Sequence, residues 1–255
     1  MLLGLWLAGC SSFGTAAPAS ETPSENVPAS DSGDARAPDG AGTAQPGRLC
    51  AAHAQALLCD DFEDGYDGGW TKLPNATFMK LEPAGAERGT AAQIAVAGQT
   101  WTDGKFGQDG VSRIIGPAAG AFTLSFALRV DEIPQNQRVE LATFGAGELY
   151  VHIILEDRAV KVVEWDVDAL TYVSKNAVAP LTIGKWQRVT LGVTYGPPNR
   201  FSAEVEGAPA FQSDFTTRPT ERFGELRVDL GILISYYAGE PTRYLVDDVL
   251  LVKQP

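Results

Sequence analysis

Strict alternation of apolar and polar residues is the feature that most limits what this chain can fold into. A period of two places the apolar side chains on one face of a β-strand. The alternation is clearest in four segments, 122–130, 149–155, 189–193 and 226–234. Turn-forming clusters lie between such segments, at 145–147, 156–158, 195–199 and 206–209. Strands that recur every 8 to 12 residues or so predict an all-β domain built as a two-sheet antiparallel sandwich, with 51–57 as its only helical candidate.

Three segments of the chain resemble the concanavalin A-like jelly rolls, in particular their laminin-G-like members. The residues are Cys59–Gly65 with the following Trp70, then Gly184–Val193, and finally Tyr244–Leu251. They look like the opening strand, the Gly-x-Trp-x-x-Val strand and the closing strand of that fold, in the same order. The resemblance implies a jelly-roll domain over 49–255. It implies no particular activity, because this fold carries lectins, glycosidases, lyases and adhesion modules.

The same resemblance implies one structural calcium ion. In these jelly rolls an acidic residue near the end of the chain often holds calcium together with groups of the opening segment. The matching positions are Asp247 with Glu63 or Asp61. Calcium takes six or more oxygen ligands, so a carbonyl such as that of Gly89 has to contribute. The alternative is that these carboxylates are hydrogen-bonded strand-end residues without a metal.

The first ten residues are apolar and end in Leu7-Ala8-Gly9-Cys10, which resembles a bacterial lipoprotein signal. The run is too short to span a bilayer, which needs about 20 apolar residues. In the lipoprotein family the signal is removed and the cysteine, here Cys10, carries the lipid. Residues 1–9 lack the Lys or Arg expected of a secretory signal. Serines follow the cysteine, as in lipoproteins that are sorted to an outer membrane. The resemblance therefore implies a cell-envelope protein that is anchored to the membrane by lipid.

The composition of residues 11–48 predicts a disordered tether. They consist largely of Ala, Pro, Ser, Thr, Gly and acidic residues, and their only large apolar residues are Phe13 and Val27. Such a segment buries too little surface to offset the entropy of ordering. A flexible chain of this length spans roughly 35 Å, which would hold the domain away from the membrane. The alternative is that the segment is low-complexity sequence without a tethering role. In that case, too, the domain that follows is expected to be exposed.

Charge and cysteine content narrow the partners and the compartment. The net charge of −12 argues against nucleic acid, anionic lipid or a polyanionic polysaccharide as a ligand, since those need a Lys/Arg surface. Neutral ligands or cations fit better. With Cys10 assigned to lipid, Cys50 and Cys59 remain as a pair in an exported chain, so we expect a disulfide. Two thiols without a nearby histidine give too few ligands for zinc.

Alternation also predicts a polar face on which a neutral sugar can stack and form hydrogen bonds. The candidate ligand-binding residues are Arg129, Glu140, Tyr150, His152, Arg227 and Asp229, on outward positions of their strands, and Trp101, in a turn-rich loop. An aromatic ring meets the apolar face of a sugar and polar groups meet its hydroxyls. The alternative is that these are ordinary solvated strand residues.

Two catalytic patterns are weaker. Glu164-Trp165-Asp166-Val167-Asp168 is similar to the Glu-x-Asp-x-Glu strand of laminarinase-type glycosidases, although the last acid is one methylene short. Its alternative is an exposed hairpin with solvated acids. Arg138, His152 and Tyr236 occur in the order of alginate-lyase-type jelly rolls, but that family's Gln-x-His is absent.

The sequence therefore favours a lipid-anchored jelly-roll domain that binds neutral carbohydrate or another exposed partner without catalysis. The alternative is a polysaccharide-degrading enzyme of the same fold.

Overall fold

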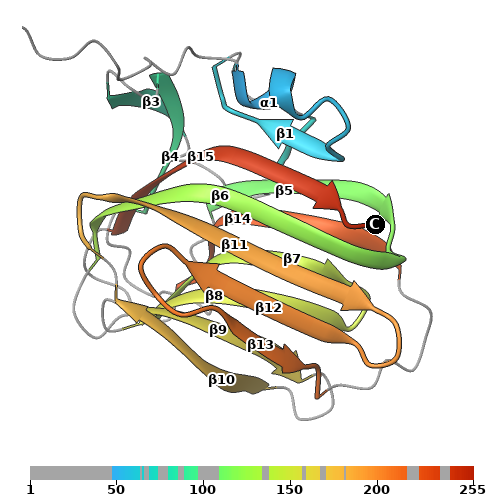
Figure 1. The fold of residues 1–255 in the computed structure, drawn as a ribbon. Helices are drawn as coiled ribbons and strands as arrows, with labels where there is room; N and C mark the ends of the chain where they lie inside the picture. The colour runs from blue at the N-terminus through green and yellow to red at the C-terminus, as the bar shows by residue number, and fades with distance from the viewer. Residues whose placement is uncertain are drawn as a thin grey trace, which may run out of the picture. The chain divides into compact units, whose positions relative to one another are not determined.

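Two antiparallel β-sheets packed face to face form a jelly-roll sandwich in the computed structural model of the chain (Figure 1). The structure describes residues 48–63, 65, 69–73, 80–85, 89–96, 109–133, 138–156, 159–166, 171–180, 182–216, 224–235 and 242–255. Four of its strands contain the four segments of strict alternation, which confirms the predicted fold class. Among the residues so described, no helix is long and apolar enough to cross a membrane.

The larger sheet, sheet A, runs in the order β13-β12-β11-β6-β15-β4-β3, and β1 pairs with β15 as well. Its strands are β1 (Leu58–Asp60), β3 (Lys80–Gly85), β4 (Gly89–Val96), β6 (Gly120–Glu132), β11 (Trp186–Tyr195), β12 (Arg200–Val205), β13 (Phe211–Asp214) and β15 (Thr242–Lys253). The last strand of the chain thus lies inside sheet A, between β6 and β4 (Figure 1).

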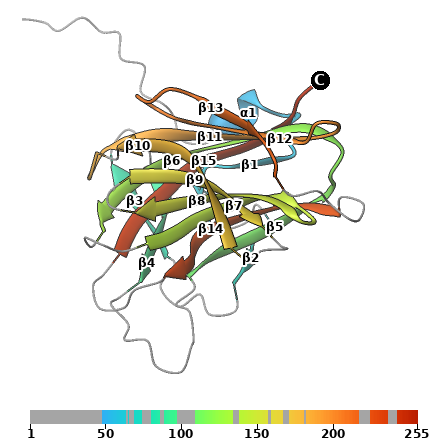
Figure 2. The same ribbon diagram turned by 90° about the horizontal axis from the view of Figure 1, so that it is seen from below.

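The second sheet, sheet B, runs in the order β10-β9-β8-β7-β14-β5-β2. Its strands are β2 (Thr71–Lys72), β5 (Asp109–Pro117), β7 (Arg138–Ala146), β8 (Leu149–Glu156), β9 (Ala159–Asp166), β10 (Thr171–Pro180) and β14 (Glu225–Ser235). Strands β7 to β10 follow one another along the chain, whereas β14 inserts between β7 and β5. Figure 2 shows the layer of β7, β8, β9 and β14 from below.

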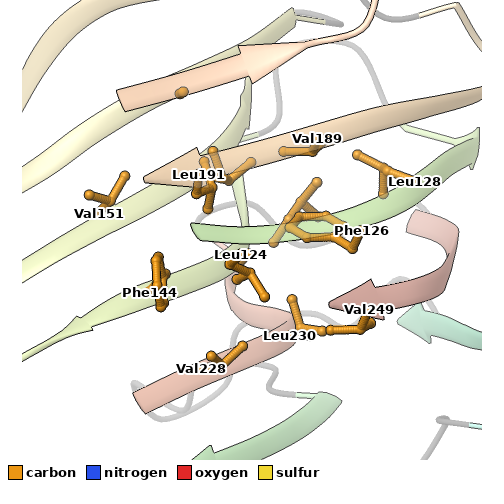
Figure 3. Close-up of a cluster of buried hydrophobic side chains, with 14 of the residues drawn as sticks. Leu124, Phe126, Leu128, Phe144, Val151, Val189, Leu191, Val228, Leu230 and Val249 are labelled. Atoms are coloured by element: carbon orange, nitrogen blue, oxygen red, sulfur yellow. The ribbon is translucent and has the colours of Figure 1, made fainter. Parts of the chain in front are cut away.

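The apolar faces of the two sheets meet in one core. Leu124, Phe126 and Leu128 of β6 are each at most 1% exposed, and they face Phe144, Val151 and Val228 of sheet B (Figure 3). The alternate residues of β6, such as Thr123 and Ser125, are half-buried on the outer face. Burying one Leu or Phe side chain contributes about 1.5–3 kcal/mol, so this core holds the two sheets together.

A disulfide joins the start of the domain to its first strand. Cys50 lies in α1 (Arg48–Ala52) and is bonded to Cys59 of β1, with a Cα–Cα distance of 5.4 Å, which confirms the expected pair. The helix was expected over 51–57, yet it ends at Ala52. The chain must turn back within nine residues for the two cysteines to meet, and backbone hydrogen bonds of turns, from His53 N to Cys50 O and from Ala56 N to His53 O, replace further helix.

Several predictions fall on residues that the structure does not describe. Cys10, the tether before Arg48 and Trp101 belong to this group. The lipid anchor, the disordered linker and the tryptophan platform therefore stay predictions.

Candidate functional site

A group of polar side chains occupies the outer face of sheet B, on three neighbouring strands. We call this group the polar face of sheet B; it consists of Glu140 and Thr143 of β7, Tyr150 and His152 of β8, and Arg227 and Asp229 of β14. The residues between them, such as Val151 and Val228, are fully buried in the core between the sheets. The same alternation that builds the core turns the side chains of β8 and β14 outward, and a β-bulge between Glu140 and Ala142 brings Glu140 and Thr143 to the same face of β7.

One half of the polar face is built around the carboxylate of Glu140. Its Oε1 accepts a hydrogen bond from Thr143 Oγ1 at 2.8 Å and lies 2.9 Å from His152 Nδ1. Although it sits on the outer side of its strand, Glu140 is only 3% exposed. An ionised carboxylate can only accept, so the contact with ionised Glu140 requires the ring proton on Nδ1 of His152. Glu140 thereby fixes the orientation of the imidazole.

The other half consists of Tyr150 and an ion pair. Arg227 Nε donates to Asp229 Oδ1 at 2.7 Å. Burial raises the pKa of the Tyr150 phenol above its usual value, while the charge of Arg227 lowers this pKa and that of Asp229 raises it. The hydroxyl of Tyr150 therefore lies within electrostatic reach of both charged groups and stays protonated at neutral pH.

The strand register places these residues in neighbouring rows. Gly145 of β7 is paired with Arg227 on one side and with Tyr150 on the other. A Cβ at position 145 would lie 2.1 Å from the carbonyl oxygen of Leu149 and 2.7 Å from Cα of Tyr150, so only glycine fits. Because Gly145 has no side chain, nothing from β7 stands between Tyr150 and Arg227. The neighbouring row pairs Thr143 with Asp229 and with His152.

Arg129 does not join this group, because its strand belongs to the other sheet. It lies on β6 of sheet A, where its Nε donates to Asp131 Oδ1 at 2.9 Å and its guanidinium lies 5.3 Å from the ring centre of Trp186. Alternation correctly predicts that Arg129 faces outward. It does not tell which of two sheets a strand enters, so Arg129 lies apart from the polar face of sheet B.

Glu164 corrects the expectation of an exposed hairpin with solvated acids. It is fully buried on β9, paired with Val151 and thus on the core side of sheet B. Its Oε2 accepts a hydrogen bond from the backbone N–H of Thr216 at 2.9 Å, across 52 residues of sequence. A carboxylate on the core side does not face a substrate bound outside the sheet, which removes the basis for a laminarinase-type catalytic strand.

The proposed calcium ligands do not gather into a recognisable site in the part of the chain that is described. Asp247 is 1% exposed, and its Oδ1 accepts a hydrogen bond from the backbone N–H of Asp248. Gly89 begins β4, and the backbone N–H of Glu63 lies 3.5 Å from Asp61 Oδ1. Within the described ranges no group of three or more His, Cys, Asp and Glu side chains is arranged to hold a metal ion. Calcium therefore stays a prediction.

The sequence does not single out one member of the polar face, Thr143, or the neighbouring residue Ile114. Thr143 donates to Glu140, and its place between two strands follows only from the register. Ile114 of β5 is paired with Arg227 and is 57% exposed, the highest value among the large apolar side chains described. The segment around Ile114 is interrupted by a β-bulge next to Arg227, so its alternation was not visible in the sequence.

The outer face of sheet A offers a different kind of surface. A shallow hollow of about 110 Å³ lies over β6, β11 and β12. Its lining includes Thr123, Ser202, Gln212 and Gln254, whereas the two aromatic residues beneath it, Phe122 and Phe201, are at most 3% exposed. The hollow therefore has hydrogen-bonding groups but lacks an exposed ring in its lining.

Comparison with known proteins identifies the fold and leaves the activity open. The chain matches no protein-family model, and a comparison with curated protein sequences finds no match. Among solved structures it is similar to the endo-β-1,4-glucuronan lyase of the fungus Trichoderma reesei, with a TM-score of 0.56 and 15% identity over 78% of this chain and 96% of that one. It is also similar to the cellulose-induced protein Cip1, with a TM-score of 0.57 and 13% identity over 77% and 97% of the two chains.

A third similar structure is that of botulinum neurotoxin type C, whose cell entry depends on interaction with two ganglioside molecules. The TM-score is 0.54 and the identity 11%, over 80% of this chain and 50% of that one. At such identities these likenesses establish the jelly-roll sandwich and nothing about the ligand.

Proposed function

We propose that the polar face of sheet B binds a neutral carbohydrate and does not catalyse a reaction on it. The observation that carries the proposal is that Tyr150 lies in one row with Arg227, across Gly145, and within electrostatic reach of the Arg227–Asp229 pair. A sugar presents an apolar ring face and a rim of hydroxyls, so its binding needs an aromatic ring beside fixed donors and acceptors. Tyr150 supplies the ring, Arg227 the donors and Asp229 the acceptor.

Charge supports a neutral ligand. The face combines two carboxylates, Glu140 and Asp229, with one guanidinium and one imidazole, in a chain of net charge −12. A polyuronate brings one carboxylate per sugar and would be repelled by this surface. A neutral sugar hydroxyl instead donates to a carboxylate oxygen without electrostatic cost.

The similar structures support a carbohydrate as the class of ligand. One is a lyase that acts on glucuronan, one is a protein induced by cellulose, and one enters cells by binding gangliosides. The shared jelly roll carries both binding and cleavage among these proteins, so the site of this chain has to decide between the two.

Cleavage at the same face is the second candidate function. It is favoured by the contact of His152 Nδ1 with Glu140, because a carboxylate that orients an imidazole is a common way to prepare a general base, and the ring of Tyr150 lies 6.4 Å from that of His152. The carboxylates of the face argue against cleavage, because both already accept hydrogen bonds from protein side chains. Glu140 is 3% exposed and accepts from Thr143 as well, and Asp229 is paired with Arg227.

A glycan array probed with the purified protein tests the proposal. We expect binding to neutral glycans, loss of this binding in Asp229→Asn, and no loss in Asp131→Asn. Asp131 is the matched control because it pairs with Arg129 two residues away on sheet A, as Asp229 pairs with Arg227 on sheet B. Equal binding by both variants would contradict the location of the site.

Incubation of the bound glycan with the protein separates the two functions. The binding proposal predicts that the chain length of the glycan does not change. New reducing ends or unsaturated products, lost in His152→Asn, would replace it with the cleavage proposal.

The cellular location of the protein is a separate proposal, supported by the sequence alone. Cys10 follows Leu7-Ala8-Gly9, so we infer that it carries a lipid anchor in a bacterial envelope, with the outer membrane favoured by Ser11 and Ser12. Labelled palmitate should enter the wild-type protein and be absent from Cys10→Ser. Equal labelling of both would overturn the anchor and would leave the glycan proposal untouched.

A further inference from the structure

The polar face of sheet B continues into an apolar spot on β5. Ile114 is paired with Arg227, which is itself paired with Gly145, so one row across four strands reads Ile114, Arg227, Gly145 and Tyr150. A single exposed apolar residue on a protein surface needs no explanation. Ile114, however, is 57% exposed and is paired with Arg227, whose guanidinium belongs to the proposed sugar site. Its position therefore makes it a candidate ligand contact.

The Arg227–Asp229 pair presents a donor beside an acceptor. Arg227 uses Nε for Asp229 Oδ1, and a guanidinium has five N–H groups in all, so its remaining N–H groups are suited to a further acceptor. The side chain of Arg227 is 42% exposed and that of Asp229 is 11% exposed. A ligand group that complements the more exposed member of this pair, Arg227, brings an acceptor.

A secondary amide meets this requirement through its C=O, which accepts, while its N–H points the opposite way within the amide plane. A sugar hydroxyl can also accept from Arg227, but it brings no apolar part for Ile114. An acetamido group brings the C=O for Arg227 and a methyl group for the side chain of Ile114. The ring of the same sugar then has Tyr150 as its neighbour in the row.

We infer that the ligand of this face is an N-acetylated amino sugar, recognised through its acetamido group by Ile114 and Arg227. This inference rests on the proposed function, since it names the sugar class for the same site. It predicts a preference that depends on one substituent of the ring and on one apolar side chain of the protein.

Chitotetraose and cellotetraose test the inference, because they share the β-1,4 linkage and differ at C2, which carries acetamido in one and hydroxyl in the other. Titration of the full-length protein should show about tenfold or stronger preference for chitotetraose, the range expected when a site loses a methyl contact and an amide hydrogen bond. Ile114→Ser should reduce the affinity for chitotetraose about tenfold and leave that for cellotetraose unchanged. Ile183→Ser is the matched control, since Ile183 is 41% exposed in the turn before β11.

The possible results distinguish the preference for an N-acetylated sugar from the binding of a neutral glycan. Equal binding of both tetrasaccharides, or equal affinity of wild type and Ile114→Ser for chitotetraose, overturns the inference and leaves a neutral-glycan site in place. Binding of neither, together with an empty neutral-glycan array, overturns the proposed function and the inference with it. Stability of each variant is measured by thermal unfolding, and Ile114→Arg serves as a second variant that blocks the same spot with a soluble side chain.

Discussion

The imidazole Nδ1 of His152 and the carboxylate Oε1 of Glu140 lie 2.9 Å apart on the outer face of sheet B. The two residues come from neighbouring strands, β8 and β7, and Thr143 donates to the same oxygen at 2.8 Å. A nearly buried carboxylate that accepts from two side chains orders this half of the polar face.

Removal of Glu140 should therefore cost stability. Glu140→Ala leaves the buried donors of Thr143 and His152 without their acceptor, so we expect the free energy of unfolding to fall by about 1–3 kcal/mol in urea denaturation. Glu156→Ala is the control, because Glu156 pairs with Lys161 at a more exposed place and such pairs contribute about 0–1 kcal/mol. Equal losses in the two variants would show that the Glu140 contacts add nothing.

The disulfide should stabilise the domain by restricting its unfolded chain. A bridge that closes a loop of this length contributes about 2–3 kcal/mol, and Cys50 and Cys59 are nine residues apart. Cys50→Ser with Cys59→Ser should lower the free energy of unfolding by that amount. A double variant as stable as the wild type, or two free thiols in the unreduced wild type, would contradict the bridge.

The sequence predicts local structure well and long-range partners poorly. Alternation correctly places Tyr150 and His152 on the outer face of β8 because the period of two depends on the strand alone. The choice of sheet depends on pairing between distant segments, which is why Arg129 was grouped with residues of the wrong sheet. Glu164 shows the same limit, since its acceptor role becomes visible only once the backbone N–H of Thr216 has been brought to it by the fold.

Glu164 itself offers a sharp test of the core. Glu164→Ala removes the acceptor of the Thr216 N–H and leaves a cavity, so the free energy of unfolding should drop by about 2–4 kcal/mol. Glu164→Gln keeps an acceptor oxygen and the side-chain volume, and we expect a smaller loss. The order of the two variants in urea denaturation is the measurement, and a loss for Glu164→Gln as large as that for Glu164→Ala would show that the charge itself is required.

Alkaline pH should destabilise the fold through Tyr195. Burial raises the pKa of its phenol well above the usual value, with a further upward contribution from Tyr150, while a hydrogen bond with the backbone of Ala146 acts in the opposite direction. A raised pKa in the folded state means that the contribution is complete below the unfolded pKa of about 10 and is lost as the pH rises above it.

The corresponding variant is Tyr195→Phe, which cannot ionise. We expect its free energy of unfolding to decline less than that of the wild type between about pH 9 and about pH 11, by up to about 1.4 kcal/mol per pH unit. Parallel curves for the two proteins over this range would mean that Tyr195 ionises alike in the folded and unfolded states.

The central claim, that the outer face of sheet B is a sugar-binding surface, is tested most directly by titrating wild type, Tyr150→Phe and Tyr150→Ala with a neutral glycan that the wild type binds. Tyr150→Ala should weaken binding by about 1–3 kcal/mol through lost stacking, with a nearly unchanged melting temperature, and Tyr150→Phe should keep most of the affinity. A loss of stability of about 3–5 kcal/mol would mark Tyr150 as a core residue. Unchanged glycan affinity in Tyr150→Ala would equally contradict the account.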